Sequence, residues 1–211
     1  MTKECRHLFG FSVMAAMAMM FFSCATQPIL RIEYELPPKT DVLSGIRVGV
    51  EVADQRQDLE LLDKSAKHEL KNFSKDIAFS VLPGEETLSI AMYDLSTLVK
   101  TTLKKQLENM GAYVLDEPGP DDPVLKVILQ RFLLTYAERT WYANVKYEAQ
   151  LVKDEPGKGQ KVLAREIMDG KGERMKIIGR TEADRVVTDT YTDTMNQLHV
   201  EDLFRRAELI K

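Results

Sequence analysis

The sequence has little of the chemistry that catalysis and metal binding use. It holds 2 cysteines and 3 histidines among 211 residues. His68 and His199 are the histidines beyond residue 7, and neither lies beside a nucleophile-elbow motif. No Gly-x-Gly-x-x-Gly or P-loop pattern is present, and Gly170-Lys171-Gly172 lacks the spacing that either motif needs. We therefore expect no enzyme, no cofactor and no metal site.

Basic charge is not in excess either. The formal net charge is −4, so nucleic acid is not expected as a partner, because phosphate binding draws on basic surface. Heptads, solenoid periods and low-complexity tracts are absent from the sequence. Hydrophobic residues make up 44% and charged residues 29%, which are typical values for a globular domain with a core of its own.

The first 23 residues have the layout of a secretory signal peptide. Lys3 and Arg6 precede an uncharged apolar run from residue 8 to residue 22, and Ser23-Cys24 closes it. The run is shorter than the roughly 20 residues that span a bilayer. A buried core helix is the alternative, which a wholly apolar segment at the extreme N-terminus disfavours.

Cys24 indicates a lipoprotein signal rather than an ordinary cleavage site. A small residue before a cysteine fits a lipobox, although Phe21 and Phe22 stand where Leu and a small residue are usual. After removal of residues 1–23, Cys24 is the one cysteine left, so no internal disulfide can form. A diacylglycerol on Cys24 with a further acyl chain, typically palmitate, anchors a protein stably in a bilayer.

The expected location is the periplasmic face of the outer membrane. An Asp after the lipidated cysteine favours retention in the inner membrane, and Ala25 stands there instead. Residues 24–29 form a short tether whose flexible part spans at most roughly 17 Å. Residues 30–211 are expected to fold as a single domain close to the membrane surface.

Alternation of apolar and polar residues predicts strands at residues 30–36 and 47–52. Residues 95–110 have helical spacing, with Asp94 as the N-cap and Gly111 as the stop. A strand at 112–115 then completes a βαβ crossover with parallel strands. The segment 57–92 is left open, with a short helix at 59–70 and a hairpin of 77–82 with 87–91 as the expectation.

The second half predicts an antiparallel meander followed by a helix. The expected strands are residues 124–135, 141–152 and 161–169, and the helix is residues 182–199. Leu203 and Phe204 follow a break and are expected to fold back onto that helix. The predicted fold is α+β: a two-layer sandwich of a mixed β-sheet with two main helices packed on one face.

Three residues are candidates for binding a partner. Asp54 and Arg56 follow the first long strand, where they form either a recognition pair or a structural ion pair, and the second alternative is favoured. Tyr142 falls on the polar face of its strand, where an aromatic ring can contact a partner. Trp141 and Tyr147 alternate as core residues do, with a lipid or glycan groove that Tyr34 would also line as the alternative.

One acidic cluster was also weighed as a calcium site. Its members are Asp116, Glu117, Asp121 and Asp122. Carboxylate oxygens suit calcium, but the prolines between them break any known loop pattern. A solvated surface turn is the preferred interpretation.

Several segments, taken in order, resemble the YajG-type family of uncharacterised bacterial lipoproteins. They are the lipobox, residues 46–56 (IRVGVEVADQR), residues 110–115 (MGAYVL) and residues 198–204 (LHVEDLF), of which VADQR is the most specific. The chain departs from the family by a longer stretch between Arg56 and Leu88. The resemblance implies a location and a fold but no activity.

These observations predict a membrane-anchored envelope lipoprotein that acts as a non-catalytic binding or adaptor module in the periplasm. Its expected partners are the bilayer, through the acyl chains on Cys24, and an envelope protein or cell-wall component. The alternative is an auxiliary lipoprotein of an envelope lipid-transport or assembly complex that binds acyl chains. An apolar groove between sheet and helices favours the alternative, and a flat polar face with isolated aromatics favours the first.

Overall fold

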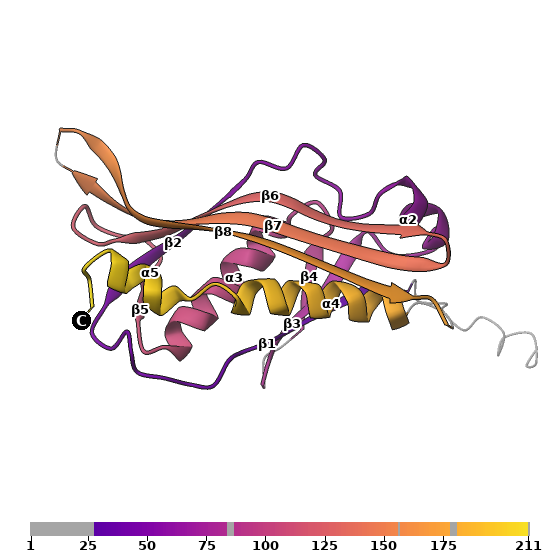
Figure 1. Cartoon of the computed structure of the whole chain (residues 1–211), viewed down its shortest axis with the longest axis horizontal. Coiled ribbons are helices and arrows are strands. Elements are labelled where there is room, and N and C mark those ends of the chain that lie inside the picture. The colour runs from indigo at the N-terminus through magenta and orange to yellow at the C-terminus, as the bar shows by residue number, and fades with distance from the viewer. Residues whose placement is uncertain (1–27, 84–86, 156, 178–180, 211) are drawn as a thin grey trace, which may run out of the picture.

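The computed structural model describes residues 28–83, 87–155, 157–177 and 181–210 (Figure 1). The predicted signal peptide, Cys24 and the tether up to residue 27 lie outside these ranges. Within them, a long β-sheet runs along the molecule, and the main helices lie along one face of it (Figure 1). The predicted α+β class is confirmed.

The larger of the two described sheets, called the large sheet here, has the strand order β5-β2-β6-β7-β8. Its strands are β2 (Arg47–Asp54), β5 (Tyr113–Leu115), β6 (Val124–Ala137), β7 (Thr140–Glu155) and β8 (Gly159–Met175). β2 pairs in parallel with β5, as the crossover predicts, and also in parallel with β6. β6, β7 and β8 form the predicted antiparallel meander.

A separate small sheet has the order β1-β3-β4. Its strands are β1 (Leu30–Glu35), β3 (Asp76–Leu82) and β4 (Leu88–Ala91). The predicted hairpin of β3 with β4 is confirmed, and β1 pairs in parallel with β3. One sheet was expected and the described strands divide into two, because alternation identifies a strand but does not identify its neighbour. The segment left open by the sequence thus holds β3, β4 and the short helix α2 (Lys64–Glu69).

Helix α3 (Leu95–Asn109) connects the two halves of the crossover. Its N-cap is Asp94, whose carboxylate accepts a hydrogen bond from the backbone N–H of Thr97. The chain leaves the helix through Gly111 at φ +90°, a left-handed conformation that glycine adopts without steric cost. The buried face of α3 packs on β2 and β5 and also contacts β3 and β4. Both helix ends fall where the sequence predicts them.

Helix α4 (Thr181–Asn196) packs on β7 and β8 and lies beside β1. Polar side chains one helical turn apart bond the backbone of β1. The Oγ1 of Thr188 accepts from the N–H of Glu33 at 3.2 Å, and the Oγ1 of Thr192 donates to the carbonyl of Glu33 at 3.3 Å. Asn196 donates to the carbonyl of Glu35 at 3.3 Å. α4 therefore supplies hydrogen bonds to an edge strand that would otherwise expose unpaired backbone groups.

Tyr191 of α4 joins both sheets and both helices at the centre of the core. Its ring is fully buried, stacks on Phe132 of β6 and meets Tyr34 of β1 edge-on, with centroid distances of 5.5 and 6.0 Å. Its hydroxyl bonds the hydroxyl of Thr102 in α3 at 2.5 Å. Phe79 of β3 completes the aromatic cluster. Large side chains therefore fill the region where the two layers meet.

The predicted burial of Leu203 and Phe204 is confirmed, but helix α5 (Val200–Arg206) packs mainly on β8, where the sequence predicts contact with the preceding helix. Helix α5 follows the break at His199. Leu203 and Phe204 both have no exposed surface. They belong to the same hydrophobic core as the α4 residues Val187 and Met195.

Candidate functional site

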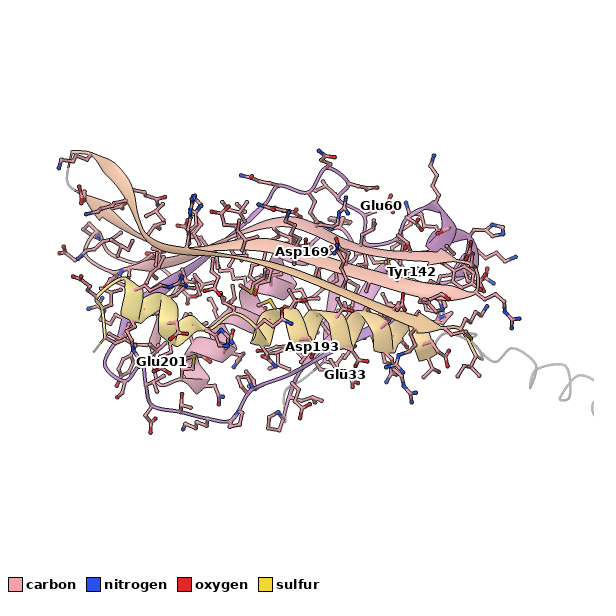
Figure 2. All side chains as sticks on the ribbon, viewed as in Figure 1. Glu33, Glu60, Tyr142, Asp169, Asp193 and Glu201 are labelled. Carbon is pink, nitrogen blue, oxygen red and sulfur yellow. The ribbon has the colours of Figure 1, made fainter. Side chains whose placement is uncertain are left out.

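The outer face of the large sheet, the face opposite the helices, is the candidate site. From Thr140 to Leu151 of β7, half-buried and buried side chains alternate. Trp141, Ala143 and Val145 are buried toward the helices, whereas Tyr142 and Asn144 are only half-buried on the other side. Figure 2 shows Tyr142 and Asp169 on the large sheet, whereas Asp193 lies on α4. The sheet thus presents a polar surface on a rigid support.

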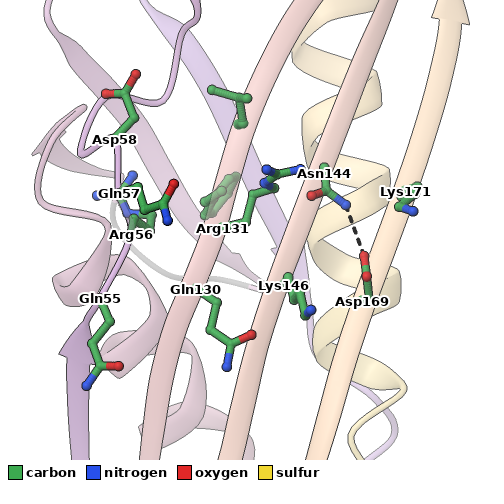
Figure 3. Close-up of a pocket in the computed structure, with 12 residues that line it drawn as sticks. Gln55, Arg56, Gln57, Asp58, Gln130, Arg131, Asn144, Lys146, Asp169 and Lys171 are labelled. Carbon is green, nitrogen blue, oxygen red and sulfur yellow. Dashed lines mark hydrogen bonds between the residues drawn. The ribbon is translucent and has the colours of Figure 1, made fainter.

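A hollow of about 510 Å³ lies on this face (Figure 3). The segment just after β2 forms one side of it, and β6, β7 and β8 contribute the rest. It is lined by Gln55, Arg56, Gln57, Asp58, Gln130, Arg131, Phe132, Leu133, Asn144, Lys146, Asp169 and Lys171. We call this the sheet hollow. Its lining is mostly amide and charged, which suits a polar ligand rather than an acyl chain.

A second hollow of about 450 Å³ continues the sheet hollow toward Tyr142. Arg131, Leu133, Asn144 and Lys171 line both, so the two form one continuous depression along β6, β7 and β8. Tyr142, predicted as a contact residue, lines this second part. The tyrosine ring therefore stands beside the polar lining and not in the core.

Strand register places three cations together in the sheet hollow. Arg131 of β6 is directly opposite Lys146 of β7, and Lys146 is directly opposite Asp169 of β8. Asp169 accepts a hydrogen bond from the Asn144 amide at 3.1 Å. Lys171 is opposite Asn144. Within the described part of the chain, Arg131, Lys146 and Lys171 make no ion pair. The sequence alone does not reveal this cluster, because the cluster depends on pairing between strands.

Asp54 and Arg56 form a buried ion pair at the end of β2. The Nε and Nη2 of Arg56 donate to the Asp54 carboxylate at 2.9 and 2.7 Å. Nη2 also donates to the carbonyl of Tyr93 at 3.1 Å. The Arg56 side chain is 1% exposed, which leaves no guanidinium surface for a partner. The geometry favours the structural alternative over the recognition pair.

The other aromatic candidates are core residues. Trp141, Tyr147 and Tyr34 are fully buried. The Tyr147 hydroxyl donates to the carbonyl of Thr194 at 3.0 Å, and the Tyr34 hydroxyl donates to Asn196 at 2.6 Å. Burial raises the pKa of Tyr34, Tyr147 and Tyr191 above the ordinary tyrosine value. These rings therefore hold α4 to the sheets rather than line a groove.

The acidic cluster weighed for calcium bonds to the protein itself. Asp116 accepts from Lys104, whose hydrogen bond and charge lower the pKa of that carboxyl. Asp122 accepts from Arg47 at 3.2 Å and from the backbone N–H of Gly119 at 2.9 Å. No group of three His, Cys, Asp or Glu arranged to hold a metal occurs among the described residues.

His68 and His199 are both exposed. In the described ranges, no helix is long and apolar enough to cross a bilayer.

Comparison with solved structures shows a shared fold. The protein XCC0632 of Xanthomonas campestris, described under the family name DUF330, superposes with a TM-score of 0.52. The match covers 82% of this chain and 94% of that one at 13% sequence identity. The chain shares the fold of that protein. At this identity the likeness shows the fold alone.

Two other solved structures are more distant. The match to lipoprotein GNA1162 of Neisseria meningitidis covers 72% of this chain and 99% of that one, with 10% sequence identity and a TM-score of 0.37. A putative neuraminyllactose-binding hemagglutinin homolog of Helicobacter pylori covers 82% and 95%, again with 10% identity and a TM-score of 0.37. Neither likeness is close enough to support an argument about function.

No protein-family model matches the sequence, and no curated protein matches it. The resemblance to the YajG-type lipoproteins therefore stays a prediction. Structural similarity extends to the fold shared with XCC0632.

Proposed function

We propose that this protein is a lipid-anchored envelope protein that binds a partner protein through the outer face of its large sheet and catalyses no reaction. The observation that carries the proposal is the continuous depression along β6, β7 and β8, with Tyr142 beside it. Interfaces are enriched in tyrosine and arginine set among polar groups. A depression on a rigid sheet offers such a surface without a large ordering cost.

The composition of the sheet hollow supports binding rather than catalysis. The described residues that line it include no histidine, cysteine or serine, so they lack the usual nucleophile and base. Apart from Arg56, which is buried with Asp54, its charged groups are Asp58 on the segment after β2 and residues of β6, β7 and β8. Such groups position a ligand by hydrogen bonds and charge.

The alternative of acyl-chain binding finds less support. It needs an apolar cavity between the sheet and the helices, and the Tyr191 cluster fills the centre of that region. A hollow between β8 and α4 is small, about 140 Å³, and polar residues such as Asp189, Asp193 and Gln197 line it. We therefore keep the binding module as the proposal.

The membrane anchor is part of the proposal and rests on the sequence. Cys24 follows an apolar signal and lies outside the described residues. Cys24→Ser should abolish metabolic labelling with palmitate and move the protein out of the membrane fraction. Equal labelling of the variant and the wild type would refute the anchor, including the proposed location at the outer membrane.

Site-specific photocrosslinking in the native cell tests the binding face. A photoreactive phenylalanine analogue replaces Tyr142 in one strain and Tyr113 in another. Tyr113 lies in β5 at the opposite edge of the large sheet and is 67% exposed, so it serves as a matched control. We expect a discrete adduct from position 142 and none of the same size from position 113. Adducts of equal size and yield from both positions, or from neither, would contradict the proposal.

A further inference from the structure

We propose that the sheet hollow binds an acidic segment of a partner polypeptide, with Arg131, Lys146 and Lys171 as the residues that hold its carboxylates. This inference rests on the proposed function and names the chemistry of the partner. It is independent of the lipid anchor.

The sheet retains two like charges at directly paired positions. Arg131 and Lys146 are directly opposite each other on neighbouring antiparallel strands. Like charges in this position destabilise a sheet. Both side chains lie on the outer face, and neither makes an ion pair with any described residue (Figure 3). A bound carboxylate between them turns this repulsion into attraction.

The charged residues that line the sheet hollow do not balance. The charge of Arg56 is matched by Asp54. The remaining charged lining has three cations, Arg131, Lys146 and Lys171, against two carboxylates, Asp58 and Asp169. One positive charge is thus in excess at this place, on a chain whose formal charge is −4. This excess favours a negatively charged ligand at the sheet hollow.

The two carboxylates of the sheet hollow limit how closely spaced the charges of a ligand can be. Asp58 comes from the segment after β2 and Asp169 from β8, so carboxylates lie on opposite sides of the sheet hollow (Figure 3). They repel a ligand with closely packed charges, such as polyphosphate or a nucleic-acid backbone. They tolerate carboxylates that are separated by neutral groups. Acidic side chains along a polypeptide have this spacing.

Side-chain amides also line the sheet hollow. Gln55, Gln57, Gln130 and Asn144 line the sheet hollow between the charged groups. The amides of Gln55, Gln57 and Gln130 each present donors and an acceptor, which are the partners that a peptide group requires. The amide of Asn144 already donates to Asp169 and to the carbonyl of Gly170, so its oxygen is the group it offers. Arginine adds a planar fork that pairs with a carboxylate in two parallel hydrogen bonds. An extended polypeptide crossing the strands satisfies both sets of groups.

The test measures binding of a labelled synthetic peptide in which glutamate alternates with serine, by fluorescence anisotropy with the full-length protein at low ionic strength. The comparison probe has glutamine in place of each glutamate. We expect the glutamate peptide to bind roughly tenfold more tightly, because each exposed ion pair contributes about two- to threefold. Equal affinity for the two peptides would overturn the inference.

Matched charge variants separate the site from general electrostatics. The triple variant Arg131→Gln/Lys146→Gln/Lys171→Gln removes the proposed site. The control triple variant Lys126→Gln/Lys153→Gln/Arg165→Gln removes the same charge from β6, β7 and β8 outside the sheet hollow. We expect roughly a tenfold loss for the first and less than about threefold for the control. Equal losses would show that net charge alone attracts the peptide and would overturn the inference.

Two further readouts address folding and ligand type. Lys146→Gln removes repulsion with Arg131 and attraction to Asp169, its two cross-strand neighbours, so it should leave the thermal midpoint nearly unchanged, and lost binding in this variant is not lost folding. Inorganic phosphate should displace the glutamate peptide only at concentrations that also weaken it through ionic strength. Displacement well below that level would show a site for small oxyanions and overturn the peptide assignment. Specific crosslinks from position 142 without glutamate-dependent binding would reject this inference alone.

Discussion

Gly172 of β8 lies directly beneath Thr190 of α4. A Cβ atom at Gly172 would come within 2.1 Å of the Thr190 hydroxyl oxygen and 3.4 Å of the Thr190 Cβ. Two residues earlier in β8, a Cβ at Gly170 would lie 1.7 Å from the Thr194 hydroxyl oxygen and 2.9 Å from the Thr194 Cβ. The two glycines let the helix approach the sheet closely. They explain Gly170-Lys171-Gly172 as a packing feature rather than a phosphate loop.

The first prediction is a stability cycle on this contact. Gly172→Ala should lower the free energy of unfolding by about 1–3 kcal/mol, because it overpacks the interface. The Thr190 hydroxyl is buried and lacks a hydrogen-bond partner among the described residues, so Thr190→Ala should cost about 1 kcal/mol or less. The double variant should be more stable than the sum of the single changes predicts, as measured by urea unfolding.

The equivalent pair at Gly170 is the control for this cycle. Thr194→Ala leaves the threonine Cβ in place, at a distance that still clashes with an alanine at position 170. Rescue should therefore be weak for Gly170→Ala with Thr194→Ala. Similar rescue at both positions would mean that the Cβ of Thr194 does not limit the approach of the helix to the sheet.

The second prediction concerns the chain end. Phe204 is fully buried in α5, so Phe204→Ala should lower the free energy of unfolding by about 3–5 kcal/mol. Arg205→Ala on the same helix removes only an exposed pair with Glu201 and should cost about 0.5 kcal/mol or less. Urea unfolding of both variants checks this. A midpoint unchanged by Phe204→Ala would refute the packing of α5.

The third prediction is instability at alkaline pH. Burial raises the pKa of Tyr34, Tyr147 and Tyr191, whereas a tyrosine in an unfolded chain ionises near its ordinary value of about 10. Above that pH the unfolded chain loses protons that the folded chain keeps, so the free energy of unfolding falls as pH rises. Below it the contribution of these residues is fully present.

Absorbance and circular dichroism can follow this transition together. We expect part of the tyrosinate absorbance to rise in one cooperative step that coincides with loss of secondary structure. Tyr191→Phe removes one of the three titrating hydroxyls and should make the decline in stability with pH less steep. Gradual ionisation of all tyrosines in a still-folded protein would contradict the prediction.

The fourth prediction concerns the ion pair at the end of β2. Asp54→Asn leaves the Arg56 guanidinium buried without its counter-charge and should lower the free energy of unfolding by about 3 kcal/mol. Arg47→Gln breaks an exposed pair with Asp122, in which Arg47 is 63% exposed, and should cost less than about 1 kcal/mol. Equal effects in chemical unfolding would contradict the structural role of Arg56.

The sequence by itself determined the elements and their faces. Asp94 and Gly111 mark the ends of α3, and the alternation around Trp141 and Tyr142 separates core from surface, because capping and side-chain direction depend on near neighbours in the chain. The burial of Leu203 and Phe204 follows from the same local pattern. The local pattern also identifies Asp54 and Arg56 as a pair at the end of a strand. It does not show that the Arg56 side chain is buried.

Only the tertiary structure decided which strands are neighbours and in what register. The division into two sheets depends on contacts between segments far apart in the chain. The meeting of Arg131 with Lys146 depends on the tight turn at Glu138 and Arg139, both at positive φ, a conformation that neither residue type signals. Lys171 joins them only through the pairing of β7 with β8. A shift of one residue would turn these side chains to the other face, so the candidate site exists only where long-range pairing fixes the register.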